Sequence, residues 1–534
     1  MAKVPKPAPE QPFATVQQEA NDRLQACREQ KTQVELDIKE CYFFAAPHRQ
    51  KQINSTTAPP TTQSTGDAAL LQTSLAFELA QDFVTVVLNT FMPEAQPWCE
   101  RRAGQFISED VWKEVADKVK AGDVKIFNAM KASNLYPEIA KSFFPDLAIG
   151  TVGLWIDAPR PGQPSVVSAI PLRELEVNLG PFGEVDDRFV VRYTKNRYVE
   201  ALLPGVDLPT EIKEKIKAKP NDRTEVRWGF WRDWSRVDDE VWKYVKMVKN
   251  TVVAEETLVG EGCCPLVVAR FNPSADWAHG NGPLMQSLPD LRQVDELAGQ
   301  KMAHVELSLT PPLGFPEDSI GAIMENGLEA GMVYPVRNGS ADAIKPLYAP
   351  GSPEAAIYQS SETEHRLRKL FFLDFPEQRG DTPPTATQWL DEMQMAQRRI
   401  GTPGLPFWHE GPAKIFLRFK YLLEKAGAIE PVTVDGKHVS LQAYNPAQRA
   451  VEQQDVAMSV RFIEIMGQAF PEEFKMVVDG RQTMTAFKEK MRETLVVFRD
   501  KKEVEAAVGQ IAQLVGGRHA PGGDQAAAQG AAPV

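Results

Sequence analysis

The segment LMQSLPDLRQVDELAGQKMAHVELSL, residues 284–309, places the strongest constraint on the architecture. Its apolar side chains recur every three or four residues, at Leu284, Leu288, Leu291, Val294, Ala298, Met302, Val305 and Leu309. This spacing predicts a helix of about seven turns with one continuous apolar face. Such a helix cannot bury that face by itself, so other parts of the protein or another subunit must cover it.

The segments that follow predict a small β structure and then more helices. Residues 310–355 contain TPPLGF, NGLEAG, RNGS and APGSP, which favour short strands and turns over helix. Ser361 and Glu364 have the spacing of a capping box, which predicts a short helix that starts there. PEQRGDTPPT, residues 376–385, predicts a loop. A further helix is expected from Thr385, with an interruption or sharp kink at 401–406, and residues 446–515 are again helical.

The segments before residue 284 predict helices first and strands later. Helices are expected from Val16 to near Pro47, from Ala68 to Phe91 and from about Ser108. Residues 145–272 are rich in short β-like runs, with a hairpin at Pro181–Gly183 and a short charged helix at 209–218. The predicted fold class is therefore α+β, mainly α, with a Pro/Lys-rich disordered arm at 1–13 and a flexible C-terminal tail.

Composition excludes several classes of protein. The chain has 534 residues, of which 43% are hydrophobic and 25% charged, as in ordinary globular proteins of three or four domains at about 150 residues each. The formal net charge is −12. A broad surface that grips nucleic acid is disfavoured, because such affinity comes from Lys and Arg that release counterions.

Cysteine usage and apolar runs indicate a soluble protein made in a cytoplasm. The five cysteines are scattered and have no CxxC pairs, so we expect reduced, inert thiols and no structural zinc. The N-terminus MAKVPKPAPEQP lacks the apolar region of a signal peptide. The apolar run Leu147–Ile156 is about half the length of a membrane span, so no membrane insertion is expected.

No local motif for catalysis or cofactor binding is present. The sequence lacks a GxxxxGK[ST] phosphate loop, a GxGxxG segment, a GxSxG elbow and an HExxH zinc motif. Asp276 with His279 is either a ligand pair or, as we favour, a loop contact. The acidic pair Asp186–Asp187 is interpreted as a solvated turn. We therefore predict no catalytic residues, no metal and no cofactor.

Four tryptophans lie close together in the β-rich region, at Trp228, Trp231, Trp234 and Trp242. Exposed aromatic rings could stack on bases of a nucleic acid. The alternative, which we favour, is cross-strand aromatic packing with arginines stacked on the rings.

Four segments in order resemble the head-to-tail connector (portal) proteins of short-tailed bacteriophages. They are FMPEAQPW (91–98), DLAIGTVGLW (146–155), CPLVVAR (264–270) with GNGPL (280–284), and GDTPPTAT (380–387). The resemblance extends over about residues 15–515. The segment GTPG (401–404) with Pro406 departs from the family, whose long helix is more continuous there.

The resemblance implies the portal fold, assembled as a ring of twelve subunits. It implies the following organisation: arm 1–13, helical wing 14–144, β-rich wing or hub 145–278, stem helix 279–309, clip 310–355, second stem helix 356–375, tunnel loop 376–385, long kinked wing helix and connection 386–439, helical crown 440–516 and tail 517–534. The stem would pack between subunits through Leu284, Leu288, Leu291, Val294, Leu297, Leu367, Leu370 and Phe371. The tunnel loop would present Gln378, Arg379, Gly380, Asp381 and Thr382 to the DNA channel, where Arg379 either touches phosphates or pairs with Asp381 or a neighbouring subunit.

The resemblance also implies partners and a location. The ring would sit at one capsid vertex of the virion, assembled in the bacterial host cytoplasm, where it nucleates the procapsid. Double-stranded DNA would pass through it without sequence recognition, and it would bind the terminase large subunit, a tail adaptor, and the major capsid and scaffolding proteins. The packaging ATPase must be a partner, since no phosphate loop is present. Two alternatives remain: a hydrolase or transferase with dispersed site residues, and another minor structural protein of the virion.

Overall fold

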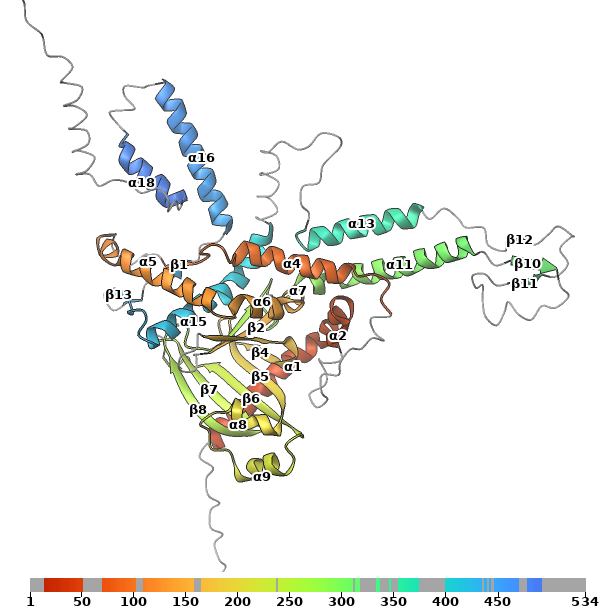
Figure 1. Cartoon of the computed structure of the whole chain (residues 1–534), viewed down its shortest axis with the longest axis horizontal. Coiled ribbons are helices and arrows are strands. Elements are labelled where there is room, and N and C mark those ends of the chain that lie inside the picture. The colour runs from red at the N-terminus through yellow and green to blue at the C-terminus, as the bar shows by residue number, and fades with distance from the viewer. Residues whose placement is uncertain are drawn as a thin grey trace, which may run out of the picture. The chain divides into compact units, whose positions relative to one another are not determined.

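The computed structural model describes residues 14–50, 70–101, 109–157, 165–236, 239–310, 313–316, 333–336, 345–346, 354–373, 399–434, 437–438, 441–442, 446–469 and 478–491. They are mostly helical, with some sheet. The predictions for the arm, the tunnel loop and the tail lie outside these residues. The chain divides into two compact units, residues 1–447 and 448–534. The first unit holds almost all described elements and is shown with the second in Figure 1.

Helices make up most of the first unit, including its projecting part. They are α1 (Ala14–Ala45), α2 (Pro47–Gln50), α4 (Leu75–Phe91), α5 (Glu109–Ala132), α6 (Leu135–Phe143), α7 (Asp146–Ile149), α8 (Val199–Leu202), α9 (Thr210–Ala218), α10 (Pro283–Gln286), α11 (Leu288–Leu309), α13 (Glu354–Leu370) and α15 (Pro412–Lys425), and residues 399–410 are also helical. The helices expected from Val16, from Ser108 and at 209–218 are confirmed.

The strands of 151–270 build two antiparallel sheets. One has five strands in sequential order, β4 (Leu175–Leu179), β5 (Val185–Lys195), β6 (Arg223–Arg232), β7 (Val241–Val248) and β8 (Thr251–Val259). The other has the order β3 (Val166–Ile170), β2 (Thr151–Asp157), β9 (Leu266–Arg270). The predicted hairpin at Pro181–Gly183 connects β4 to β5, and Gly183 adopts a φ of 80° there. Leu147–Ile149, expected as the start of a strand, form the helical turn α7 instead.

The five-stranded sheet is covered on both faces. Helix α1 crosses one face, where Leu24 and Cys27 pack with Phe189, Trp231 and Met247 in a separate small core. Because side chains alternate along a strand, the neighbouring residues point the other way and join the main core. The main core continues through the second sheet and α4, α6 and α15, so the wing-like part of the molecule is one packed body.

The single gap in the apolar pattern of α1 is explained by a buried ion pair. Lys31 lies on the covered face, and its Nζ donates to the carbonyl oxygens of Leu172 and Leu175 (2.9 Å each) and to the carboxylate of Glu176 (3.1 Å). These bonds satisfy a cation that would otherwise be costly to bury. The helix therefore runs through this position without a break.

Short strands and the second unit complete the described structure. A three-stranded sheet has β10 (Leu313–Pro316) at its centre. β11 (Val333–Val336) pairs with β10 in parallel, and β12 (Lys345–Pro346) pairs with it antiparallel. The small β structure expected in 310–355 is therefore confirmed. The remaining strands are β1 (Glu100–Arg101), β13 (Thr433–Val434), β14 (Lys437–His438) and β15 (Leu441–Gln442). Helices α16 (Pro446–Ala469) and α18 (Gly480–Met491) confirm helix in part of 446–515.

Two predicted helix starts are wrong. Residues 70–74 are not helical, because Asp295 accepts the backbone N–H groups of Gln72 (2.8 Å) and Thr73 (3.1 Å) and holds them in a turn, so α4 begins at Leu75. Ser361 does not cap a helix, because α13 already begins at Glu354. The hydroxyl of Thr363 donates to the carbonyl oxygen of Gln359 in the preceding turn (2.8 Å), so the polar residues near Ser361 do not interrupt α13.

The predicted interruption at 401–406 is also wrong. Residues 399–410 are helical throughout, and the change of direction comes at Gly411, before α15. Gly404 lies so close to the ring of Phe91 that a Cβ there would be 2.5 Å from Cζ. Glycine at this position therefore permits close packing of the helix on the core.

Candidate functional site: the helix pair and its junction with the core

Helices α11 and α13 form a pair that projects from the core toward the small sheet β10–β12 (Figure 1, green and teal). Arg366 of α13 donates to Asp290 of α11 at 2.8 Å and ties the two helices together. On the core side, Arg292 of α11 forms an ion pair with Glu40 of α1. The helices expected at 279–309 and 356–375 are thus present, as α10 with α11 and as α13, and this pair is the candidate site.

The residues predicted to pack the stem lie at the core end of the pair. Their side chains are covered within the single chain: Leu284, Leu288, Leu291, Val294, Leu367 and Phe371 are buried, and Leu297 and Leu370 are partly buried. They anchor the pair to the core without help from a second subunit. The predicted channel residues Gln378, Arg379, Gly380, Asp381 and Thr382 lie outside the described residues.

The outer half of the pair carries large apolar side chains that are open to solvent. Its exposed side chains are Met302 (62%), Val305 (57%) and Leu309 (78%) on α11, and Ile357 (52%) and Tyr358 (72%) on α13. Five large apolar side chains on one projecting element are a stronger sign of a binding surface than single exposed residues. We call these five residues the apolar stripe.

The sequence pattern identifies three of the five residues of the apolar stripe. Met302, Val305 and Leu309 are in the pattern of residues 284–309, whereas Ile357 and Tyr358 lie in the predicted helix 356–375 but were not among its named packing residues.

The pair joins the core where three backbone segments pass at close range. A Cβ on Gly150 would lie 2.5 Å from the backbone of Gly280, and one on Gly282 would lie 2.2 Å from the carbonyl oxygen of Ala148. Backbone bonds lock the contact, with the N–H of Gly282 donating to Ile149 (2.8 Å). The segments 146–155 and 280–284, which carry the sequence resemblance, are thus in direct contact. We call residues 146–151, 271–284, 371–373 and 399–411 the junction.

Aromatic rings fill the space between the elements of the junction. Phe83 of α4 has its ring centroid 5.1 Å from that of Phe271 and 6.2 Å from that of Phe371, both edge to face. Phe91 packs against Phe407 at 6.0 Å. Edge-to-face contacts of this kind add to the stabilisation that burial provides. The end of α13 is therefore fixed to the core and to the helix at 399–410.

A buried ion pair lies at the edge of the junction. Arg270 bonds the carboxylate of Glu410 through its side chain and its backbone N–H (3.0 Å to Oε2), and it also donates to the carbonyl of Trp277 (3.2 Å). The charge is paired and its donors have acceptors, which is the condition for burying arginine at moderate cost. Its role is structural, because it holds β9, the 271–282 loop and the helix at 399–410 together.

His279, which the sequence analysis considered together with Asp276, lies in the same loop. It is fully buried, and neither ring nitrogen has a hydrogen-bond partner. Burial and, to a smaller extent, the nearby cations Lys31 and Arg270 lower its pKa to about 3. Among the described residues, no three His, Cys, Asp or Glu side chains are grouped as metal ligands would be.

The acidic pair predicted to be solvated is buried instead. Asp187 forms an ion pair with Arg23 of α1 at 2.7 Å, and Asp186 accepts the indole N–H of Trp234 at 2.9 Å. Burial raises the pKa of both carboxyls above its ordinary value. The prediction is wrong because the covering residues come from distant parts of the sequence.

The tryptophan cluster is packing, as favoured from the sequence. Trp228, Trp231 and Trp242 are buried. Arg188 lies 4.4 Å from the ring centroid of Trp242, and Arg192 lies 6.0 Å from that of Trp228. Since the ring faces are covered by the protein itself, these three residues do not offer a platform for bases.

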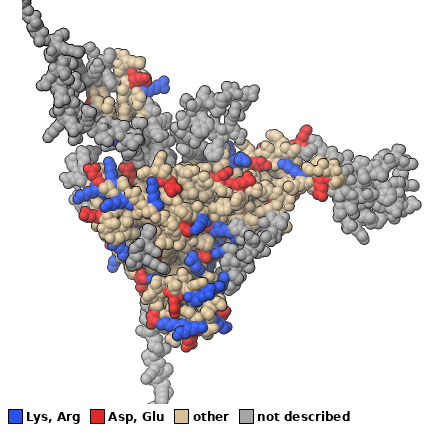
Figure 2. Space-filling model, viewed as in Figure 1, with Lys and Arg blue, Asp and Glu red and all other residues tan. Residues whose placement is uncertain are grey.

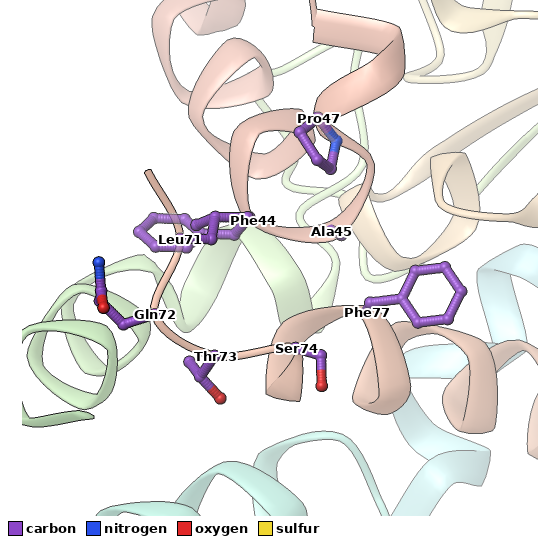
Figure 3. A pocket seen from close by; sticks show the side chains of 8 residues that line it. All are labelled: Phe44, Ala45, Pro47, Leu71, Gln72, Thr73, Ser74 and Phe77. Carbon is purple, nitrogen blue, oxygen red and sulfur yellow. The ribbon is translucent and has the colours of Figure 1, made fainter. Parts of the chain in front are cut away.

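A recess of about 430 Å³ lies between the end of α1 and the start of α4, beside the helix pair (Figure 3). It is lined by Phe44, Ala45, Pro47, Leu71, Gln72, Thr73, Ser74 and Phe77. None of these side chains titrates near neutral pH, so the recess offers no acid, base or activated nucleophile. It adds apolar surface next to the helix pair and supplies no chemistry.

Charges of both signs are interspersed on the face shown in Figure 2, and the described residues in that view form no broad basic field. This distribution agrees with the net charge of −12. Within the described ranges, no helix has both the length and the apolar character needed to cross a membrane.

A comparison with protein families gives a match over most of the chain. A family described as bacteriophage head to tail connecting protein matches residues 17–491. No curated protein matches the chain. Among solved structures, it is similar to a chain in the neck of an empty gene transfer agent particle computed with C6 symmetry (11% identity, 72% of this chain and 85% of that chain, TM-score 0.32). It is also similar to a chain in the virion of a native gene transfer agent particle (10% identity, 73% and 92%, TM-score 0.28).

Proposed function

The chain belongs to the bacteriophage head-to-tail connecting protein family, and on this premise we propose that it is the portal of a tailed phage. The portal would be a closed ring of twelve subunits at one capsid vertex of the virion. The family match carries the proposal. The apolar stripe supports it, because a projecting helix pair with a solvent-exposed apolar face needs a neighbour to cover it.

The proposed subunit contact extends outward from the residues predicted for the stem. Leu284, Leu288, Leu291, Val294, Leu367 and Phe371 are covered within one chain, so in the ring they would support the helix pair from inside. The apolar stripe would make the contact with the next subunit. A ring requires each subunit to present two different, complementary surfaces, and the stripe would be one of them.

A role as a DNA conduit agrees with the charge of the chain. Double-stranded DNA carries one negative charge per about 1.7 Å of its axis, so a basic lumen would hold it through counterion release. A ring of twelve copies, each at −12, has a formal charge of −144. Such a ring would let DNA slide. Residues Gln378–Thr382 are proposed to face the channel, with Arg379 as the contact to phosphates.

The proposed partners follow from this position. The ring would bind the terminase large subunit during packaging and a tail adaptor afterwards, and it would nucleate a shell of major capsid and scaffolding proteins in the host cytoplasm. The protein would act structurally in all of these roles.

Native mass spectrometry of the purified full-length chain, combined with negative-stain electron microscopy, tests the proposal. We expect one closed assembly of about twelve subunits with a central hole. A chain that stays monomeric at micromolar concentration and in the presence of its scaffolding protein would contradict it.

A further inference from the structure

The C-terminal end of α13 stops in a conformation that its sequence does not favour. Phe372 has a φ of 60°, in the left-handed region. The N–H of Leu373 donates to Arg368 (2.8 Å) and that of Phe372 to Lys369 (3.3 Å), which is the hydrogen-bond pattern of a Schellman end. Glycine normally occupies the left-handed position in this motif, and a bulky aromatic residue there is strained. Something outside the helix must therefore hold this end in place.

Packing of the Phe372 side chain explains why an aromatic residue is there. Its ring centroid lies 6.3 Å from that of Phe83 and 6.2 Å from that of Phe271. Phe83 comes from α4 and Phe271 follows β9. The ring thus links the end of α13 to two core elements, and a glycine would lose this link.

Arg399 holds the same end from the other side. Its Nη2 donates to the carbonyl oxygen of Lys369 at 2.9 Å, and its guanidinium lies 5.9 Å from the ring centroid of Phe372. A cation at the C-terminal carbonyls of a helix is favourable for the helix dipole, and a guanidinium near an aromatic ring adds a cation–π contact. One side chain therefore contacts both the last turn of α13 and the strained residue.

The helix that carries Arg399 also holds a second strained residue of the junction. Asn272 has a φ of 48°, and its N–H donates to the carbonyl oxygen of Pro403 at 3.1 Å. Among the described residues, the other non-glycine residue with positive φ is Lys249, in the turn between β7 and β8. Both left-handed residues of the junction thus contact the helix at 399–410, Asn272 through a hydrogen bond to Pro403 and Phe372 through the guanidinium of Arg399.

From these contacts we propose that Arg399 is a positioning residue that fixes the direction of the helix pair relative to the core. It acts through Lys369 and Phe372, and its contacts lie within one chain. The inference rests on the proposed function, because a ring closes with a defined number of subunits only if every helix pair leaves its core at the same angle. Without Arg399, the strained end of α13 relaxes and the angle varies.

Distance measurements between spin labels test the proposal directly. Labels on cysteines introduced at Glu362 of α13 and Lys141 of α6, both exposed, report the direction of the helix pair. The five native cysteines are buried, so a chain without introduced cysteines serves as the labelling control. Labelled chains are diluted into unlabelled chains so that distances within one subunit dominate.

Three variants of Arg399 and Phe372 give distinct expectations. Arg399→Met removes the donor and the charge and should broaden the distance distribution at least two-fold, whereas Arg399→Lys keeps a cation and a donor and should restore most of its sharpness. Phe372→Gly relieves the strain but removes the ring, so it should also broaden the distribution. A Phe372→Gly distribution as narrow as that of the wild type would mean that the ring is not needed, and would overturn the proposal.

The matched control is Arg28→Gln, which removes an arginine ion pair of α1 with Glu225 (3.2 Å) outside the helix pair. It should leave the distribution unchanged. Arg399→Met with a wild-type distribution, or Arg28→Gln with an equally broad one, overturns the proposal. Ring formation is scored separately: a wild-type chain that forms no ring contradicts the proposed function, while the distance distributions still decide the role of Arg399.

Discussion

Gly150 shows how the junction depends on a single residue. Its φ is 134°, and a Cβ would lie 2.5 Å from the backbone of Gly280, where no flexible side chain can give way. We predict that Gly150→Ala lowers the free energy of unfolding by about 3 kcal/mol or more, from strain and overpacking together. The midpoint of urea unfolding measures this.

The control for that prediction is Gly183→Ala. Gly183 also has a positive φ, of 80°, but nothing lies within 4 Å of the position of its Cβ. This substitution should lower the free energy of unfolding by only about 1 kcal/mol, the cost of the left-handed conformation for alanine. Equal losses in the two variants would show that the close approach of Gly150 to Gly280 contributes nothing.

His279 predicts an acid sensitivity with a defined sign. Its pKa is about 3 in the folded chain, because of burial first and of Lys31 and Arg270 second, against an ordinary value of 6.5. The unfolded chain therefore binds a proton first, and stability that is complete above pH 6.5 is lost as pH falls from 6.5 toward 3, by up to about 1.4 kcal/mol per pH unit.

The test compares wild type with His279→Leu, which has no nitrogen to protonate. Because neither ring nitrogen has a partner, leucine loses no hydrogen bond, and the variant should be at least as stable at pH 7. Urea midpoints of the variant should fall less between pH 6.5 and 4.5. Parallel pH profiles for the two proteins would contradict the assignment.

At the scale of elements, α11 is one helix with two environments. Its first half is buried in the core, and its second half carries the exposed residues of the apolar stripe. We predict that Val305→Asp and Leu309→Asp leave the subunit folded but prevent rings, because each interface would have to bury an unpaired charge at a cost of several kcal/mol. Sedimentation velocity measures the ring fraction.

The matched control is Leu36→Asp, which places the same charge at a 76% exposed leucine of α1, outside the helix pair. It should form rings like the wild type. Leu291→Asp is a different case: Leu291 is 3% exposed, so the charge would disrupt the core itself. Rings formed normally by Leu309→Asp would exclude the stripe as the contact between subunits.

The helix pair was predictable from the sequence, but its division into a covered and an open half was not. A spacing of three and four residues specifies which face of α11 is apolar, from Leu284 to Leu309. It does not specify how far the core extends along that face. The same limit explains Asp187, whose burial depends on Arg23, 164 positions away in the sequence.

Local rules also failed where tertiary contacts override them. Gly401–Gly404 has the composition of a break, yet the helix continues there because Gly404 lets the ring of Phe91 approach. By contrast, Gly150 and Gly280 belong to segments that already carry the sequence resemblance. The structure explains why glycine is needed at both positions, because the two backbones are in contact there.

At the scale of the whole molecule, the described core behaves as a rigid support for a projecting pair of helices. The buried ion pair of Arg270 with Glu410 and the aromatic contacts of Phe83 fix the base of the pair. On this projecting pair, the single chain leaves the apolar stripe exposed. Its proposed cover, a second copy of the chain, connects the fold to a ring.

Electron cryo-microscopy of the purified full-length protein tests this central claim most directly. The account predicts a closed ring with a central channel, in which Met302, Val305 and Leu309 of each subunit are buried against the next. A ring in which these three side chains remain in solvent would contradict the proposed contact. A monomer with the same helix pair, unchanged by scaffolding protein, would contradict the ring itself.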